Sequence, residues 1–214
     1  MCWNSQISLN TFLFSTFILI LIIYNNKNTQ YKIHDFNNIY AYLFLFSFIA
    51  MQLVEYFLWK NLSNKSVNHF FSLMGSLLLL LQPFFSLMML KNHQLRNWIA
   101  PGYLIIGAIN LFYQNWKTPF YTSVSKNSHL IWNWGKWNYY SILYIGWLIL
   151  ISLSFFLNKQ YYFIIIGIGL LLLSYYFYFR DGSVHSIWCW SVNIIMFILA
   201  AKLLMVLPYR EKKC

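Results

Sequence analysis

The side chains best suited to chemistry in this sequence are a carboxylate inside an apolar run, two cysteines beside tryptophans, and a histidine. Of the four acidic residues, Asp35, Asp181 and Glu211 fall in polar stretches, whereas Glu55 lies within the apolar run QLVEYFLW. An ionisable group inside a membrane segment is costly unless it is paired or hydrated. Glu55 is therefore a candidate buried site acid. The alternative is a carboxylate that reaches the membrane surface or is held by a neighbouring amide.

Two of the three cysteines stand in Cys-Trp pairs at the edges of apolar runs, in MCWNS and IWCWS. If Cys2 and Cys189 meet His129 on one face, these residue types could form a disulfide, a metal site with a carboxylate, or a thiol nucleophile beside a histidine base. No spacing is diagnostic of one of these, and separate buried thiols are a further alternative. Cys214, in the tail REKKC, is expected to be a plain free thiol.

The dipeptide Gln82-Pro83 interrupts another apolar run. A proline inside a helix removes one backbone hydrogen bond and kinks the helix, so carbonyl groups in the preceding turn need other partners. Gln82 is a candidate for such a partner and for the lining of a polar cavity. The alternative is a kink of purely structural use.

The composition indicates an integral membrane protein. Of the 214 residues, 60% are hydrophobic and 9% are charged, whereas a soluble domain has about 25% charged residues. The net charge of +11 would suggest nucleic acid in a soluble chain, but the Lys and Arg residues stand singly between apolar runs. They are interpreted as loop anchors, with the lipid bilayer and not nucleic acid as partner.

Seven apolar runs approach the length of about 20 residues that is needed to cross the hydrocarbon core. The expected fold class is an all-α integral membrane protein, a seven-transmembrane-helix bundle in a single domain over residues 1–214. The shortest run has Pro101 in its first turn, where proline is tolerated. The predicted spans are Ser8–Tyr24, Ile39–Trp59, Val67–Leu90, Trp98–Tyr113, Tyr139–Leu157, Tyr161–Phe179 and Ser186–Leu207.

The connection between the fourth and fifth helices is more than a simple turn. In the stretch WKTPFYTSVSKNSHLIWNWGKW, β-branched and aromatic residues stand on both sides of Lys126-Asn127. This pattern is typical of two short strands around a turn. We expect a small β-hairpin or cap over the outer face.

The loop charges favour an N-terminus outside and a C-terminus in the cytoplasm. Lys202, near the end of the last run, is expected to extend toward the inner surface. Cys2, Glu55, His129 and Cys189 then share the outer face, where the first and last helices end as neighbours. The predicted inner side carries Lys27, Lys32, Lys91, Arg96, Lys159, Arg210, Lys212 and Lys213, and the outer side carries Lys60, Lys65, Lys117, Lys126, Lys136 and Arg180.

Established catalytic and cofactor motifs are missing from the sequence. HExxH, GxSxG and phosphate-loop patterns do not occur. A retinal protein is disfavoured because Lys202 is too close to the inner end for a mid-membrane Schiff base, and the third run has no acidic counter-ion. No cofactor is predicted.

Short motifs are spread over nearly the whole chain: the opening Met-Cys-Trp, QLVEYFLW, Gln82-Pro83, HLIW and the late IWCW. Together they resemble a family of multi-pass membrane proteins of unknown function that occurs in bacteria, fungi and large DNA viruses. The family pattern has an acidic residue and a proline before the late Trp-Cys, where this chain reads DGSVHSIWCW, and some members have extra loop cysteines. These departures weaken a metal or catalytic role. The resemblance implies shared positions at Cys2, Trp3, Glu55, Gln82, Pro83, His129, Trp132, Trp188 and Cys189.

The sequence leaves three functions open. The preferred one is binding or transport of a small molecule or lipid, amphipathic or cationic, in a pocket at the outer face, because aromatic rings with few polar groups suit such ligands. The second is a membrane-embedded enzyme that uses Cys2 or a metal, with Glu55 or His129 as acid or base. The third is an accessory protein in which a disulfide between Cys2 and Cys189 joins the first helix to the last. Candidate pocket residues are Glu55, Gln82, His129, Trp132 and Trp188.

Overall fold

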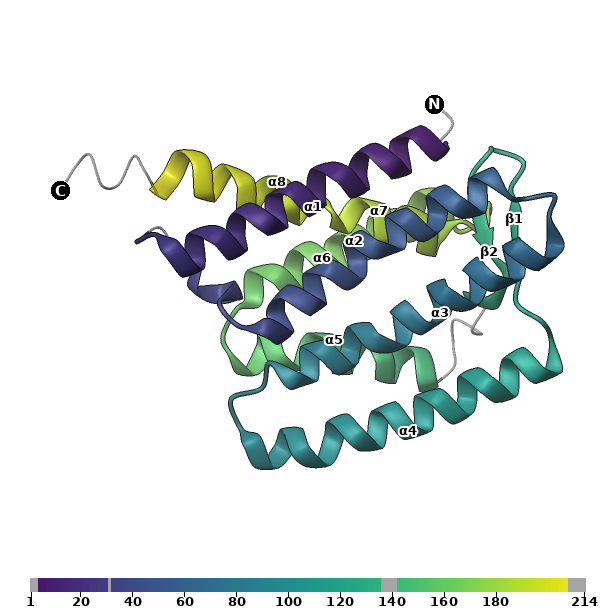
Figure 1. The fold of residues 1–214 in the computed structure, drawn as a ribbon. Helices are drawn as coiled ribbons and strands as arrows, with labels where there is room; N and C mark the ends of the chain where they lie inside the picture. The colour runs from purple at the N-terminus through teal and green to yellow at the C-terminus, as the bar shows by residue number, and fades with distance from the viewer. Residues whose placement is uncertain (1–3, 31, 136–141, 208–214) are drawn as a thin grey trace.

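The computed structural model describes residues 4–30, 32–135 and 142–207, and most of these residues are helical (Figure 1). A two-stranded sheet of β1 (Thr122–Val124) and β2 (Leu130–Trp132) follows the fourth helix. Short 3-10 turns cover His34–Phe36 and Asn133–Gly135, and a π turn covers Lys202–Val206. The helices are α1 (Ser5–Asn28), α2 (Ile39–Lys60), α3 (Lys65–Met88), α4 (His93–Lys117), α5 (Ile142–Leu157), α6 (Tyr161–Tyr178), α7 (Val184–Val192) and α8 (Ile194–Ala201).

Five helical stretches of the described chain are long and apolar enough to cross a membrane. They are α1, α2, α3, α6 and the continuous segment Val184–Val206. The helix α5 is apolar but shorter, and the apolar centre of α4 is flanked by amides and charged residues at both ends. A mainly helical fold with membrane-type helices is thus confirmed, whereas the number of seven spans stays a prediction.

The first four helices begin in the same way. In each case an asparagine stands at the N-cap, and its side-chain oxygen accepts a hydrogen bond from the backbone N–H three residues later. Asparagine is among the best N-cap residues because it satisfies one of the unpaired N–H groups of the first turn. The four caps are Asn4, Asn38, Asn64 and Asn92.

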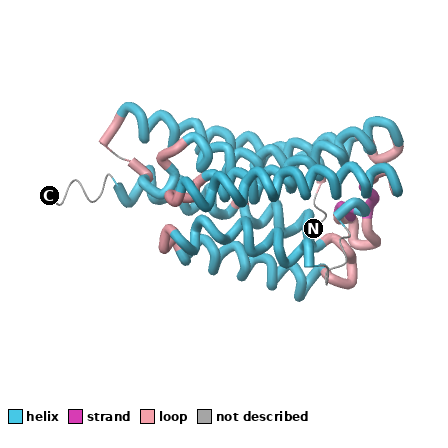
Figure 2. The backbone as a smooth tube through the Cα atoms, turned by 90° about the horizontal axis from the view of Figure 1, so that it is seen from below, coloured by secondary structure: helices cyan, strands magenta, loops and turns pink. Residues whose placement is uncertain are grey.

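Six helical units form a closed ring, and α4 lies outside it. Along the ring α1 packs on α2, α2 on α3, α3 on α5, α5 on α6 and α6 on α7. The helices α7 and α8 form one continuous unit, and α8 packs on α1 and so closes the ring. The helix α4 packs mainly on α3 and lies along one edge of the bundle (Figure 1). In the view of Figure 2 the strands lie at one end of the bundle.

The predicted hairpin is confirmed. Strands β1 and β2 are antiparallel, with Thr122 opposite Trp132. The side chain of Asn68 in α3 acts as an additional pairing partner, because its Nδ2 donates to the Thr122 carbonyl (2.9 Å) and its Oδ1 accepts from the Thr122 N–H (2.8 Å). Ser72 and Trp134 each share a hydrogen bond with the Thr122 hydroxyl. The hairpin is therefore fastened to the start of α3.

Pro83 lies inside α3 and leaves the Leu79 carbonyl without its helical N–H partner, and neighbouring helices bind this carbonyl and the next one. Trp147 Nε1 from α5 donates to the Leu79 carbonyl (2.9 Å), and the Tyr103 hydroxyl from α4 donates to the Leu80 carbonyl (2.9 Å). Gln82 was one candidate for such a partner, beside a kink of purely structural use, and within the described residues its fully buried amide has no hydrogen bond. Successive positions on a helix point about 100° apart, so a side chain next to the proline need not face these carbonyls.

Candidate functional site

Glu55 is buried in a small polar cluster at the hairpin end of the bundle. Its Oε1 accepts a hydrogen bond of 2.6 Å from the Ser186 hydroxyl, which joins α2 to α7. The carboxylate side chain is 3% exposed. Ser8 of α1 and His129, which precedes β2, line the same space, whose volume is about 10 Å³. We call Ser8, Glu55, His129 and Ser186 the hairpin-end polar cluster.

The imidazole of His129 is held in place by contacts around it. Its ring packs edge-on against Tyr178, with centroids 5.2 Å apart, and the backbone of His129 exchanges hydrogen bonds with Ser125. The buried Nδ1 atom has no hydrogen-bond partner in the described part of the chain. Burial lowers the pKa of His129, and the charge of Asp181 opposes this effect. The neutral imidazole is therefore favoured near neutral pH.

The other candidate pocket residues do not line the space beside Glu55. Trp132 stacks on Trp134 with a centroid separation of 4.9 Å. Trp188 packs between α2 and α5 and donates from Nε1 to the Gly167 carbonyl (3.0 Å). Since α2 and α3 are antiparallel neighbours, Gln82 lies about 18 Å further from the hairpin end than Glu55, at 1.5 Å per residue. The structure brings Glu55 and His129 together and separates them from Gln82.

The cysteine predictions are met only in part. Cys189 is completely buried and is a free thiol. Cys2 lies outside the described residues, so a pairing with Cys189 stays a prediction. Trp190 Nε1 donates to the Thr11 hydroxyl (3.1 Å), which confirms that the first and last helices end as neighbours at this face. Among the described residues, no group of three His, Cys, Asp or Glu side chains could hold a metal ion.

A cavity of about 310 Å³ lies between α3, α4 and α5, and a larger hollow of about 580 Å³ lies between the start of α3 and the hairpin. We call the cavity between α3, α4 and α5 the wedge cavity, because α4 packs mainly on α3 and diverges from α5. Its polar groups include the amides of Asn110 and Gln114, which are hydrogen-bonded to each other (3.2 Å). The sequence did not reveal this site, although two amides four residues apart in an apolar run share one helix face. Its aromatic lining comes from Tyr103, Phe120, Trp134 and Trp147.

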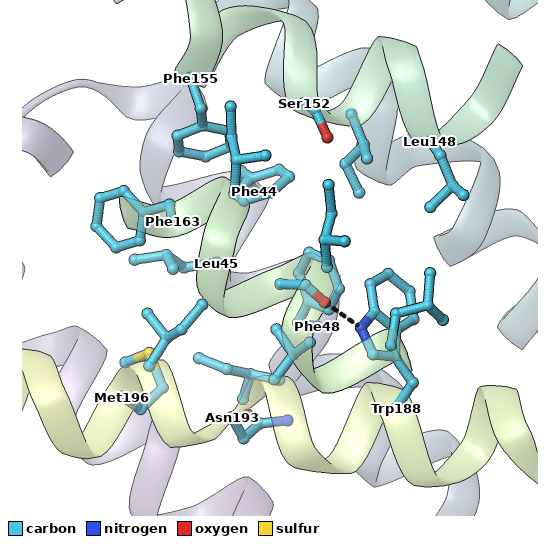
Figure 3. A pocket seen from close by; sticks show the side chains of 18 of the residues that line it. Phe44, Leu45, Phe48, Leu148, Ser152, Phe155, Phe163, Trp188, Asn193 and Met196 are labelled. Atoms are coloured by element: carbon cyan, nitrogen blue, oxygen red, sulfur yellow. Dashed lines mark hydrogen bonds between the residues drawn. The ribbon is translucent and has the colours of Figure 1, made fainter. Parts of the chain in front are cut away.

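A second cavity lies inside the ring and is almost entirely apolar (Figure 3). Its volume is about 80 Å³, and it is enclosed by α2, α5, α6, α7 and α8. The phenylalanine rings around it stack edge-on or tilted against one another. We call it the ring cavity; Figure 3 shows Phe44, Phe48, Phe155, Phe163, Trp188 and Met196 around it.

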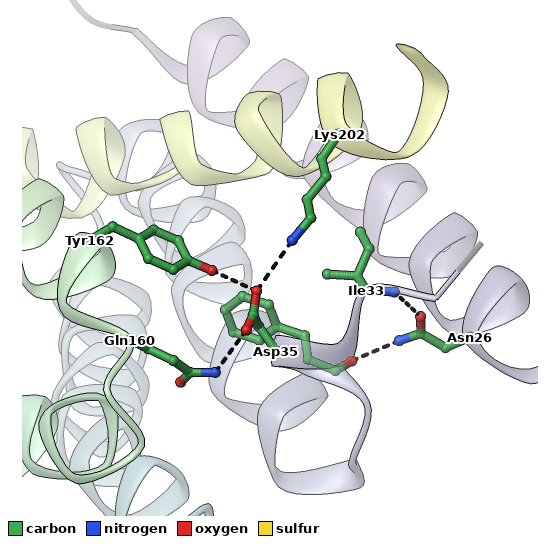
Figure 4. Close-up of polar contacts among 7 residues, drawn as sticks. Asn26, Ile33, Asp35, Gln160, Tyr162 and Lys202 are labelled. Atoms are coloured by element: carbon green, nitrogen blue, oxygen red, sulfur yellow. Dashed lines mark hydrogen bonds and ion pairs between the residues drawn. The ribbon is translucent and has the colours of Figure 1, made fainter. Parts of the chain in front are cut away.

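At the opposite end of the bundle, Asp35 joins three segments that are distant in the sequence (Figure 4). Its Oδ2 accepts from the Tyr162 hydroxyl (2.6 Å) and pairs with Lys202 Nζ (3.3 Å), and its Oδ1 accepts from Gln160 (3.1 Å). Burial alone would raise the pKa of Asp35, but the Tyr162 hydrogen bond, the Lys202 charge and the Gln160 amide together lower it. Lys202 thus reaches a partner in the protein, whereas the sequence predicted only an extension toward the surface.

Comparison with protein families, with curated proteins and with solved structures finds no match to this chain. Its function therefore has to be inferred from its own geometry.

Proposed function

We propose that this chain is a multi-pass membrane protein that binds a small, uncharged amphipathic molecule in the wedge cavity. The observation that carries the proposal is the volume of this cavity, about 310 Å³, together with its mostly apolar lining from three helices, because ligand pockets measure about 300–1,000 Å³ and are lined mainly by apolar side chains. The larger hollow beside the hairpin, about 580 Å³, has Lys65, Asn68 and His69 in its lining. The ring cavity, at about 80 Å³, and the space beside Glu55, at about 10 Å³, are smaller. The proposed ligand site therefore differs from the pocket around Glu55 that the sequence favoured.

The lining of the wedge cavity supports an amphipathic occupant. Leucine, isoleucine and aromatic side chains form most of its wall. Asn110 and Gln114 lie in the last two turns of α4 before the hairpin connection, so a polar head would lie toward the hairpin end and an apolar tail toward the middle of the bundle. The described lining residues include no charged side chain, which favours an uncharged head over the cationic ligand that the sequence also allowed.

We also propose that all seven helical runs cross the membrane, and the surface of α4 supports this. Ile105, Ile109 and Phe112 are each at least 60% exposed along its middle, as expected for side chains that contact lipid. Trp98 and Trp116 are exposed toward its two ends, about 27 Å apart at 1.5 Å per residue. This separation approaches the thickness of the hydrocarbon core, about 30 Å, and tryptophan is enriched at both membrane interfaces.

The proposed orientation has the N-terminus and the hairpin outside and the C-terminus in the cytoplasm. It is supported by the larger number of Lys and Arg residues on the predicted inner side. The wedge cavity then has its polar end toward the outer leaflet. A ligand from that leaflet could enter beside α4, because α4 packs mainly on α3.

The ligand site can be tested by filling the cavity. Gly146 of α5 lines the wedge cavity, and a Cβ added there would meet no atom within 4 Å. Gly146→Leu should therefore place a side chain in the ligand space without a backbone clash. We expect native mass spectrometry of the purified protein to show a monoacylglycerol adduct, with affinity reduced by about tenfold in the variant, equivalent to about 1.4 kcal/mol.

The matched control is Gly102→Leu. Gly102 of α4 also has open space around an added Cβ, and it is not among the residues that line the wedge cavity. This control should bind monoacylglycerol as the wild type does. Equal binding by all three proteins, or tighter binding of a long-chain alkyltrimethylammonium ion than of monoacylglycerol, would overturn the proposal.

A further inference from the structure

The space between the residues of the hairpin-end polar cluster has the size of one water molecule. Its volume of about 10 Å³ is close to the minimum of about 10–15 Å³ that a buried water requires. A buried water also needs two to four polar partners. The side chains of Ser8, Glu55, His129 and Ser186 all line this space, so it offers a carboxylate, an imidazole and two hydroxyls.

An unpaired atom of His129 points to the same occupant. His129 is 6% exposed, and its Nδ1 has no hydrogen-bond partner in the described part of the chain. A buried polar atom without a partner costs about 1–3 kcal/mol, and a water in this space would remove that cost. The hydrogen bonds with Ser125 fix the backbone of His129, and the ring itself packs against Tyr178.

Glu55 needs a way to exchange its proton. It forms no ion pair with a cationic side chain among the described residues, and a charged carboxylate inside a membrane segment is costly without one. The Ser186 hydroxyl supplies one hydrogen bond to Oε1. At 3% exposure the carboxyl group is nearly sealed from solvent. Its proton therefore has to pass through a neighbouring group.

We propose that Glu55 and His129 share one bound water and form a proton-exchange site at the outer end of the bundle. In the uptake direction a protonated His129 gives a proton to the water, and the water gives a proton to the Glu55 carboxylate. The products are a neutral imidazole, the same water and a neutral carboxylic acid. The imidazole then takes the next proton from the outer solution, and release follows the same steps in reverse.

The titratable groups around this pair come from α6, α7 and the connection between them, and they include Tyr178 of α6, which packs edge-on against His129. Cys189 of α7 is completely buried and interacts electrostatically with Glu55, while Asp181 interacts with His129. From α1 and α7 the contacts are the hydroxyls of Ser8 and Ser186. His185 contacts Tyr144 of α5, with centroids 5.7 Å apart, and lines a different small space. His129 is thus the imidazole that shares a space with Glu55.

Infrared spectroscopy of the full chain in lipid bilayers tests the proposal. A protonated Glu55 gives a carboxyl C=O stretching band that shifts when the sample is transferred to D₂O, and Glu55→Gln should remove this band. His129→Gln keeps a polar side chain but cannot carry the proton. We expect the shift to slow on the order of a hundredfold in this variant, because positioned acids and bases accelerate proton transfer by about 10²–10⁴.

His69→Gln is the matched control. His69 lies in the same end of the bundle, but its Nδ1 contacts the Phe120 carbonyl (2.8 Å), so the exchange rate should be that of the wild type. A carbodiimide, which reacts with protonated carboxyl groups, should label Glu55 in the wild type, and this measurement needs no variant. Failure to label Glu55, or an unchanged exchange rate in a folded His129→Gln protein, would overturn the proposal.

Discussion

At the residue scale, the two ends of the bundle hold their buried carboxylates differently. Asp35 has a cation, a hydroxyl and an amide as partners, whereas Glu55 has a hydroxyl and an imidazole close by. The Asp35 side chain is 28% exposed and lies in a loop, and Glu55 is almost completely buried. The partners of Asp35 favour a charged, structural carboxylate, and the surroundings of Glu55 favour one that exchanges a proton.

Asp35→Asn should destabilise the protein in a pH-dependent way. The folded-state pKa of Asp35 lies below its ordinary value, so the charged form contributes stability above the unfolded pKa of about 3.9. This contribution is lost as the pH falls through the folded pKa. We expect the variant to have a lower Tm at pH 7, corresponding to about 1 kcal/mol for hydrogen bonds to a partly exposed charge. The difference should diminish below about pH 4.

Thermal unfolding in detergent across this pH range measures the effect. Asp181→Asn is a suitable control, because Asp181 accepts a hydrogen bond from Ser183, only two residues away, and this bond connects no distant helix. A Tm difference for Asp35→Asn that stays constant from pH 7 down to about pH 3, below the unfolded pKa, would contradict the role assigned to the charged form.

At the element scale, α3 is the helix on which the rest of the bundle is assembled. It contacts α2, α4, α5 and the hairpin. Its backbone is also bound from outside, because Trp147 binds the Leu79 carbonyl that Pro83 leaves without a helical partner, and Tyr103 binds the adjacent Leu80 carbonyl. These contacts attach α5 and α4 to α3, and the three helices together enclose the wedge cavity.

The attachment at Trp147 predicts a coupling between two substitutions. Trp147→Phe leaves the Leu79 carbonyl without its partner, and an unsatisfied buried group costs about 1–3 kcal/mol. Pro83→Ala restores an N–H that can bind this carbonyl within α3, so Trp147→Phe should cost about 1 kcal/mol less in the Pro83→Ala background. The free energy of unfolding of the four proteins in mixed micelles measures the coupling.

Trp188→Phe is the control for this double-mutant cycle of Trp147→Phe and Pro83→Ala. Trp188 also donates to a helix carbonyl, that of Gly167, but α6 contains no proline. Its cost should be the same in the wild-type and the Pro83→Ala backgrounds. The interpretation fails if Pro83→Ala leaves the cost of Trp147→Phe unchanged.

At the scale of the whole molecule, the decisive property is the orientation of the bundle in the membrane. Lys126 in the hairpin turn and Lys91 between α3 and α4 are both exposed and stand at opposite ends of α4. In a background with Cys2→Ser and Cys214→Ser, a membrane-impermeant maleimide should label Lys126→Cys in intact cells. It should label Lys91→Cys only after permeabilisation. The reverse result would invert the proposed orientation, and labelling of both in intact cells would contradict the seven-span topology.

Much of the fold follows from local sequence. The apolar runs and the pattern around Lys126-Asn127 each act over a few residues, so they predict helices and a hairpin without knowledge of neighbours. The convergence of Glu55 and His129 also follows, because alternate helix ends in a bundle share one face. The sequence by itself determined that these two side chains meet at that end.

Only the tertiary structure decided the partners and the empty spaces. The partners of the α3 carbonyls near Pro83 and the volume of the wedge cavity both depend on how the neighbouring helices are spaced. This spacing is set by packing between residues that are distant in the sequence. Asp35 and Lys202 are a further example, since their pairing requires α8 to lie beside the loop after α1. The pattern of residues in a sequence predicts the direction in which a side chain points from its own helix. The atoms that this side chain contacts belong to another helix, whose position the pattern does not give.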